Sequence, residues 1–220
     1  MKQYQMSEAL PVGLCLALGG GMLDAYSYLQ RGQVFATAET GNIVLLSINL
    51  SMANWSQALH YLLPVLAFFA GVLSTELLRR RLDRNGSWLH WRQYLLLVEC
   101  LAVVVVSLLP QSMNPLANII ISFASAIQVD SFRSFNGCGC ATTMCTGNLR
   151  SGTEHLYHWL FHRQGTALDK AKVYYGLILA FITGALICGL LSGFGGRQTV
   201  LIACIPMLTA FAMMFLEKRD

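Results

Sequence analysis

Two copies of the pattern T-x-x-T-G-N carry most of the polar chemistry of this chain. The first reads TAETGN at 37–42, and the second reads TMCTGN at 143–148, 106 positions later. Thr and Asn are good N-cap residues, and Gly permits a tight turn and a close approach of the backbone. A helix N-terminus offers free N–H donors and partial positive charge. Each copy could therefore cap a helix, or hold an anion or a polarised oxygen of a solute.

An aspartate precedes each copy at the same distance. Twelve residues separate Asp24 from Thr37, and twelve separate Asp130 from Thr143, so both halves read D-x12-T-x-x-T-G-N. Both aspartates fall in apolar stretches, where an ionisable side chain costs about 2.5–3.5 kcal/mol on insertion scales. They could bind a proton or a cation, or they could accept N–H groups of the loop before each TGN.

The duplicated pattern predicts a path for a small solute or ion between the two copies. Glu39 and Glu99 are further acids in apolar surroundings and could couple a proton to transport, although the counterpart of Glu39 is Cys145. The candidate residues of the path are Asp24, Thr37, Thr40, Gly41, Asn42, Gln128, Asp130, Thr143, Thr146, Gly147 and Asn148.

A cysteine cluster suggests a different chemistry. Cys138, Cys140 and Cys145 are soft ligands, but they lack a fourth ligand and a paired C-x-x-C motif. The chain also shows no catalytic Ser/His/Asp order, no nucleotide loop and no nucleic-acid module. We therefore expect no metal, no cofactor and no enzymatic activity. The alternatives are a membrane-embedded redox or metal-binding protein that uses these thiols, and a structural membrane subunit without a path.

Composition places all these residues in a membrane. The chain is 55% hydrophobic and 12% charged, with a mean hydropathy of +0.53, whereas soluble domains carry about 25% charge. A bilayer needs about 20 apolar residues per helix. Two shorter segments, 40–53 and 146–162, each begin with TGN. Six longer stretches qualify as spans, at 9–30, 58–78, 93–110, 115–135, 173–192 and 198–216.

Positive charge decides whether the two shorter segments cross. If both crossed, the basic loops at 79–92 and 163–172 would lie on opposite faces. If neither crosses, only Arg31 and Arg197 of the 15 basic residues lie outside. The cytoplasmic set is then Lys2, Arg79, Arg80, Arg81, Arg84, Arg92, Arg133, Arg150, Arg163, Lys170, Lys172, Lys218 and Arg219.

The prediction is an all-α inner-membrane protein with about six transmembrane helices, two re-entrant TGN half-helices and both termini in the cytoplasm. Residues 1–110 and 111–220 form two repeats of three spans plus one half-helix. After an insertion of about seven residues near 163–170, Gly71 aligns with Gly184. An odd number of spans inverts the second repeat, so the half-helices meet near the midplane. The expected partners are the bilayer and a small solute; a homodimer is compatible, and no nucleic acid is expected.

The segments GGGMLDAYSYL, VFATAETGN and TTMCTGNLRSG resemble the YoaK-like family of bacterial inner-membrane proteins, a domain of unknown function. The resemblance runs through most of the chain. It departs where the family pattern has Gln-Asn and this chain has Gln128-Val129. The resemblance implies a membrane location and about six helices, and it supplies no substrate. The residues that carry it are Gly20, Gly21, Asp24, Phe35, Thr40, Gly41, Asn42, Thr142, Thr143, Thr146, Gly147 and Asn148.

Overall fold

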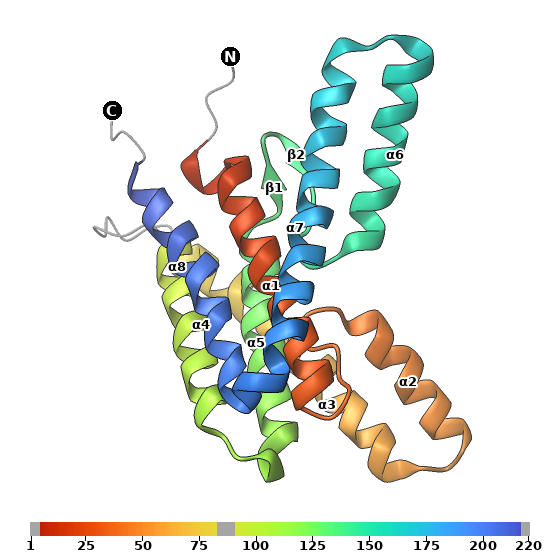
Figure 1. Cartoon of the computed structure of the whole chain (residues 1–220), viewed down its shortest axis with the longest axis vertical. Coiled ribbons are helices and arrows are strands. Elements are labelled where there is room, and N and C mark those ends of the chain that lie inside the picture. The colour runs from red at the N-terminus through yellow and green to blue at the C-terminus, as the bar shows by residue number, and fades with distance from the viewer. Residues whose placement is uncertain (1–4, 83–90, 217–220) are drawn as a thin grey trace.

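A computed structural model describes residues 5–82 and 91–216, which form mainly helices (Figure 1). Four of the basic positions used to predict the topology, Lys2, Arg84, Lys218 and Arg219, lie outside these ranges. The long helices are α1 (Leu10–Gln30), α2 (Glu39–Ser51), α3 (Trp55–Leu82), α4 (Trp91–Leu108), α5 (Asn114–Ser131), α6 (Cys145–His162), α7 (Gly165–Gly195) and α8 (Cys204–Met213). Short 3-10 turns are η1 (Met6–Glu8), η2 (Gln111–Met113), η3 (Gly196–Ala203) and η4 (Met214–Leu216).

Five stretches of the described chain are long and apolar enough to cross a membrane: Leu10–Gln30, Trp55–Arg79, Trp91–Leu108, Gln111–Ser131 and Gly165–Leu216. The last contains two arms, because the chain reverses after α7 and returns through η3 and α8 (Figure 1). Gly196 makes this reversal with a φ of +51°. Large apolar side chains on these helices, such as Phe69 and Leu190, remain exposed as lipid contact would require. The all-α membrane fold is thus confirmed.

One predicted span is shorter than expected. The sequence predicts a span over 115–135, but α5 ends at Ser131 and is followed by the antiparallel strands β1 (Ser134–Phe135) and β2 (Cys138–Gly139). Asn136 and Gly137 form the turn between them with φ values of +48° and +74°. An Asn-Gly pair favours such a hairpin because both residues tolerate positive φ. The hairpin also reaches α1, since Asn136 Oδ1 accepts a hydrogen bond of 3.0 Å from the Leu10 amide.

Two close crossings join helices from the two halves of the chain. α1 packs along α7, and α3 packs along α5. At the first crossing, a Cβ on Gly184 would lie 2.0 Å from the Leu18 carbonyl oxygen, and a Cβ on Gly21 would lie 2.0 Å from the Phe181 carbonyl oxygen. At the second, a Cβ on Gly71 would lie 2.6 Å from the Phe123 carbonyl oxygen. Only glycine permits these approaches.

The remaining helices attach to this frame. α2 packs on α3, and α6 packs on α7. Figure 1 shows these two hairpins extending in opposite directions from the middle of the molecule, with α2 and α6 both beginning there. α4 and α8 pack against each other, α4 also against α5, and α8 against α1. The packing of α2 on α3 and of α6 on α7 therefore places the first residues of α2 and α6 in the same region of the molecule.

A buried arginine fixes the end of α1. Arg31, which the topology prediction placed simply outside, is fully buried. Its Nε donates to the Tyr26 hydroxyl at 2.8 Å, and Asn118 Nδ2 donates to its carbonyl at 2.8 Å. The guanidinium therefore connects α1 to the end of α4, where carbonyls that have no partner within the helix favour a cation. Its other acceptors are the carbonyls of Val106, Leu109 and Pro110 and the side chain of Asn114.

Replacing Gly184 with Ala should disrupt the α1–α7 crossing. The added methyl would collide with backbone rather than with a flexible side chain, so the helices must separate, at a cost of about 2 kcal/mol or more in the free energy of unfolding. Thermal unfolding of the purified protein measures this. Gly193→Ala is the matched control on α7, because a Cβ there meets no atom within 4 Å. Equal melting temperatures for the two variants would contradict the crossing.

Candidate functional site

A cavity of about 580 Å³ lies between the starts of α2 and α6. The predicted path residues that line it include both Thr-Gly pairs, Asp24 and Thr143, and the predicted coupling residue Glu39 also lines it. The two motifs, far apart in sequence, thus share one cavity. Its lining residues are Asp24, Phe35, Ala38, Glu39, Thr40, Gly41, Ile43, Phe68, Thr143, Met144, Cys145, Thr146, Gly147 and Phe181.

Much of this lining consists of matched positions in the two halves. Four pairs are related by the offset of 106 residues, and the fifth follows the register that aligns Gly71 with Gly184. Both halves therefore contribute equivalent wall segments to the cavity. The pairs are Ala38 with Met144, Glu39 with Cys145, Thr40 with Thr146, Gly41 with Gly147, and Phe68 with Phe181.

The motif threonines and asparagines do not cap α2 and α6 in the expected way. The N-cap residues are Ala38 and Met144, and neither makes a side-chain cap hydrogen bond. Thr40 and Thr146 instead lie in the first turn of each helix. The N-cap interpretation is wrong because each helix begins one residue before its TGN, which moves the hydroxyl past the capping position.

The two asparagines fasten the preceding loops. Asn42 Nδ2 donates to the Phe35 carbonyl at 2.8 Å, and its Oδ1 accepts from the Phe35 amide at 3.1 Å. Asn148 repeats this with Ala141, at 2.7 Å to the carbonyl and 3.4 Å from the amide. Both side chains are buried, and neither is among the cavity-lining residues. They hold the loop backbone in place behind the cavity wall.

Asp24 combines a structural contact with a place on the cavity. Its Oδ1 accepts a hydrogen bond of 2.8 Å from the Thr37 amide, so it holds the loop that returns from the end of α1. Ser27 supports the same loop by accepting a hydrogen bond of 3.2 Å from the Ala36 amide. Thr37 is fully buried and does not line the cavity. Asp24 therefore both holds the loop through its hydrogen bond with Thr37 and lines the cavity.

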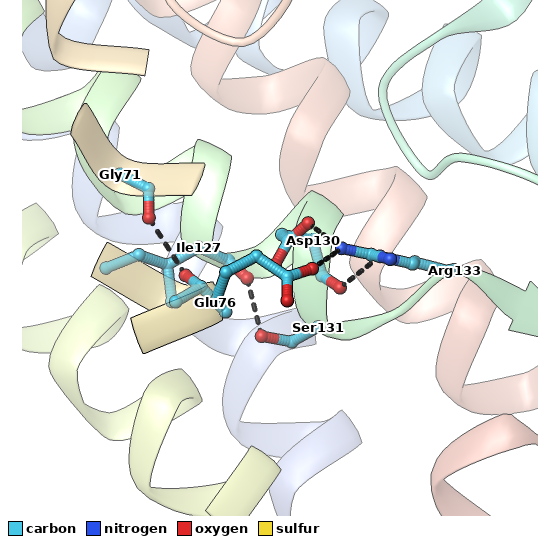
Figure 2. A network of polar contacts seen from close by, with 7 residues as sticks. Gly71, Glu76, Ile127, Asp130, Ser131 and Arg133 are labelled. Atoms are coloured by element: carbon cyan, nitrogen blue, oxygen red, sulfur yellow. Dashed lines mark hydrogen bonds and ion pairs between the residues drawn. The ribbon is translucent and has the colours of Figure 1, made fainter. Parts of the chain in front are cut away.

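Asp130 occupies a different environment despite its matched position. Figure 2 shows Asp130 and Glu76 converging on Arg133, which forms an ion pair with each carboxylate. The hydrogen bond that Arg133 donates to the Asp130 carboxylate raises the pKa of the guanidinium. Asp130 is not among the residues that line the cavity. Asp24 and Asp130 thus occupy matched positions in the two halves of the sequence but have different partners.

Gln128 and Glu99 form a second buried polar cluster. In the amide orientation that satisfies both its ends, the Gln128 NH2 group lies 2.7 and 2.9 Å from the Glu99 carboxylate oxygens. Its oxygen lies 3.1 Å from Thr142 Oγ1. Neither Glu99 nor Gln128 lines the cavity, but Thr142 precedes the lining residue Thr143. No ion pair within the described ranges involves Glu99.

The three cysteines do not meet at one site, because Cys138 and Cys140 belong to one apolar cluster and Cys145 lies apart from it. Cys138 is buried among apolar residues that include Val12 and Leu16, whereas Cys145 lines the cavity. Burial raises the pKa of the Cys140 thiol to about 11, which disfavours the thiolate needed for metal binding. Across 5–82 and 91–216, no three His, Cys, Asp or Glu side chains are grouped closely enough to hold a metal ion.

The sequence prediction missed most of the apolar wall. Phe35, Phe68, Phe181, Ile43, Ala38 and Met144 line the cavity but were not named as site residues. A signal did exist for one pair, since Phe68 and Phe181 fall together in the register that aligns Gly71 with Gly184. A phenylalanine in a membrane span does not by itself indicate a site, because most phenylalanines in such spans face lipid or the core.

The apolar exposed helices and the shared cavity define a polytopic helical membrane protein. The chain belongs to the family described as "Protein of unknown function (DUF1275)", whose model matches residues 12–213. It is similar to the "UPF0700 transmembrane protein YoaK" of Bacillus subtilis (strain 168), with 27% identity over 209 residues, 92% of this chain and 91% of that protein. No solved structure matches the chain. The resemblance to YoaK-like proteins is thus confirmed.

Replacing Asn148 with Ala should loosen the second TGN loop. The change leaves the Ala141 amide and carbonyl without their side-chain partner, which should cost about 2 kcal/mol in the free energy of unfolding. Asn42→Ala should cost at least as much, because it also removes the hydrogen bond to Glu39 Oε2. Asn49→Ala is the control, since among the described residues the Asn49 side chain donates only to the Leu45 carbonyl of its own helix. Melting temperatures report the effect, and an equal loss in Asn49→Ala would remove the special role of the motif asparagines.

Proposed function

We propose that this protein is a transporter or channel for a small solute or ion in the bacterial inner membrane. The path passes through the cavity between the two TGN segments. The observation that carries the proposal is that matched positions of both halves line this one cavity. A cavity of about 580 Å³ falls in the range of small-molecule sites, about 300–1,000 Å³.

An inverted repeat is part of this proposal. The pairing of α1 with α7 and of α5 with α3 supports it, because each half lends its first long helix to the other half. The matched contacts of Asn42 with Phe35 and of Asn148 with Ala141 support it as well. In inverted-repeat carriers, solute sites lie where such halves meet near the midplane.

The proposal treats α2 and α6 as re-entrant half-helices. α2 has 13 residues and spans about 20 Å at 1.5 Å per residue, which is short of a bilayer core of about 30 Å. α6 has 18 residues but carries Arg150 and Glu154 on exposed positions. Both helices begin at the cavity, so they need only reach one face from there. This arrangement leaves both termini in the cytoplasm under the positive-inside rule.

Flux measurements on vesicles that contain the purified protein test this proposal. The panel comprises alkali cations, small amines, carboxylates and neutral polyols. We expect wild-type protein to pass at least one of them. Thr146→Trp should abolish most of that flux, because the indole of a residue in the cavity wall would occupy the path.

Leu160→Trp is the matched control, since Leu160 lies on the same helix and is exposed. Its flux should equal that of the wild type. Absence of flux for every solute in the panel would refute the proposal and favour a structural subunit. Flux that survives unchanged in Thr146→Trp would place the path elsewhere.

A further inference from the structure

The charged residues that line the cavity are both acidic. Asp24 is 6% exposed, and its Oδ1 binds the Thr37 amide. Glu39 Oε2 accepts a hydrogen bond of 2.8 Å from Asn42 Nδ2. Among the described residues of the wall, none is Lys, Arg or His. The side chains therefore give the cavity a negative charge when both carboxyls are ionised.

Two polar atoms in this region lack a partner. Thr143 lines the cavity and is only 3% exposed, and its Oγ1 has no hydrogen-bond partner among the described residues. Glu39 Oε1 is likewise buried and makes no hydrogen bond in that part of the chain, and the Ser122 hydroxyl is a nearby donor for the same carboxylate. An unmatched buried polar atom costs about 1–3 kcal/mol, so such atoms are normally paired. An N–H group supplied by a ligand would satisfy the Thr143 oxygen.

The helix N-termini do not reverse the sign. The starts of α2 and α6 each contribute about +0.5 of an elementary charge. Two of them offset about half of the charge of two ionised carboxylates. The sequence pattern alone favoured an anion or a polarised oxygen at TGN, but Asp24 and Glu39 in the same wall favour a cation.

Aromatic rings form much of the remaining wall. Phe35, Phe68 and Phe181 come from the loop before α2, from α3 and from α7. Phe35 stacks on Tyr28 with ring centroids 4.9 Å apart, which fixes its orientation. An aromatic face attracts an ammonium group with about 0.5–2 kcal/mol. A bare alkali ion needs neither three rings nor a cavity of about 580 Å³.

We infer that this cavity binds a small organic cation, an amine or a quaternary ammonium compound. Asp24 and Glu39 provide the charge, the Thr143 hydroxyl accepts a hydrogen bond where the ligand has an N–H, and the phenylalanines surround the alkyl groups. The inference rests on the proposed function for the transfer of this solute across the membrane. Binding itself is measurable without flux.

Calorimetric titration of the full-length protein in lipid nanodiscs tests the inference, with tetramethylammonium and methylammonium chloride as probes. Potassium chloride and sodium acetate serve as the comparison solutes. Saturable binding of at least one ammonium probe is expected in the wild type. Glu39→Gln and Asp24→Asn should each weaken it by about tenfold, the effect of losing one charge partner.

Both variants keep the local hydrogen bonds available, because a Gln oxygen can still accept from Asn42 and an Asn oxygen from the Thr37 amide. Glu154→Gln is the matched control at an exposed position of α6 and should bind like the wild type. Unchanged affinity in folded Glu39→Gln would overturn the inference. Saturable binding of acetate or of potassium alone, without either ammonium probe, would overturn it as well.

The two proposals can fail separately. Ammonium binding that depends on Glu39, with no flux in vesicles, would keep this inference and refute transport. Flux of an anion or a neutral solute that Thr146→Trp blocks, with no ammonium binding, would keep transport and refute this inference.

Discussion

Two helix crossings, each with glycine at the point of closest approach, hold the two halves of this protein together. Gly184 lets α7 reach the Leu18 carbonyl on α1, and Gly71 lets α3 reach the Phe123 carbonyl on α5. In a bilayer, helices gain little from leaving lipid, so close van der Waals contact at small residues governs their association. Because each crossing joins a helix of one half to a helix of the other, the position of each half depends on its partner.

The cavity follows from these crossings. α2 lies on α3 and α6 lies on α7, so the frame that sets α3 and α7 also sets where α2 and α6 begin. Phe68 and Phe181, which line the cavity, precede Gly71 and Gly184 by three residues, about one helical turn. The residues that permit close packing and those that shape the site therefore share the same turn of each helix.

The class of fold could be predicted from the sequence because long apolar stretches indicate membrane helices. That the two TGN motifs lie close together could be predicted because the same polar pattern occurs in both halves. The sequence could not assign partners that depend on the approach of distant helices. Asp130 finds Arg133 and Glu76 only because α3 lies beside α5. The direction of the Asn42 and Asn148 side chains depends on loop conformation. The burial of Arg31 depends on the end of α4.

Cross-linking between the motifs tests the central claim that both line one cavity. A cysteine-free protein that carries Thr40→Cys and Thr146→Cys should be linked within one chain by a short bifunctional maleimide, since both positions line the cavity. Thr146→Cys paired with Ser51→Cys, at the far end of α2, should not be linked. Linkage of the Ser51 pair, or failure of the Thr40 pair when both thiols react singly, would contradict the account.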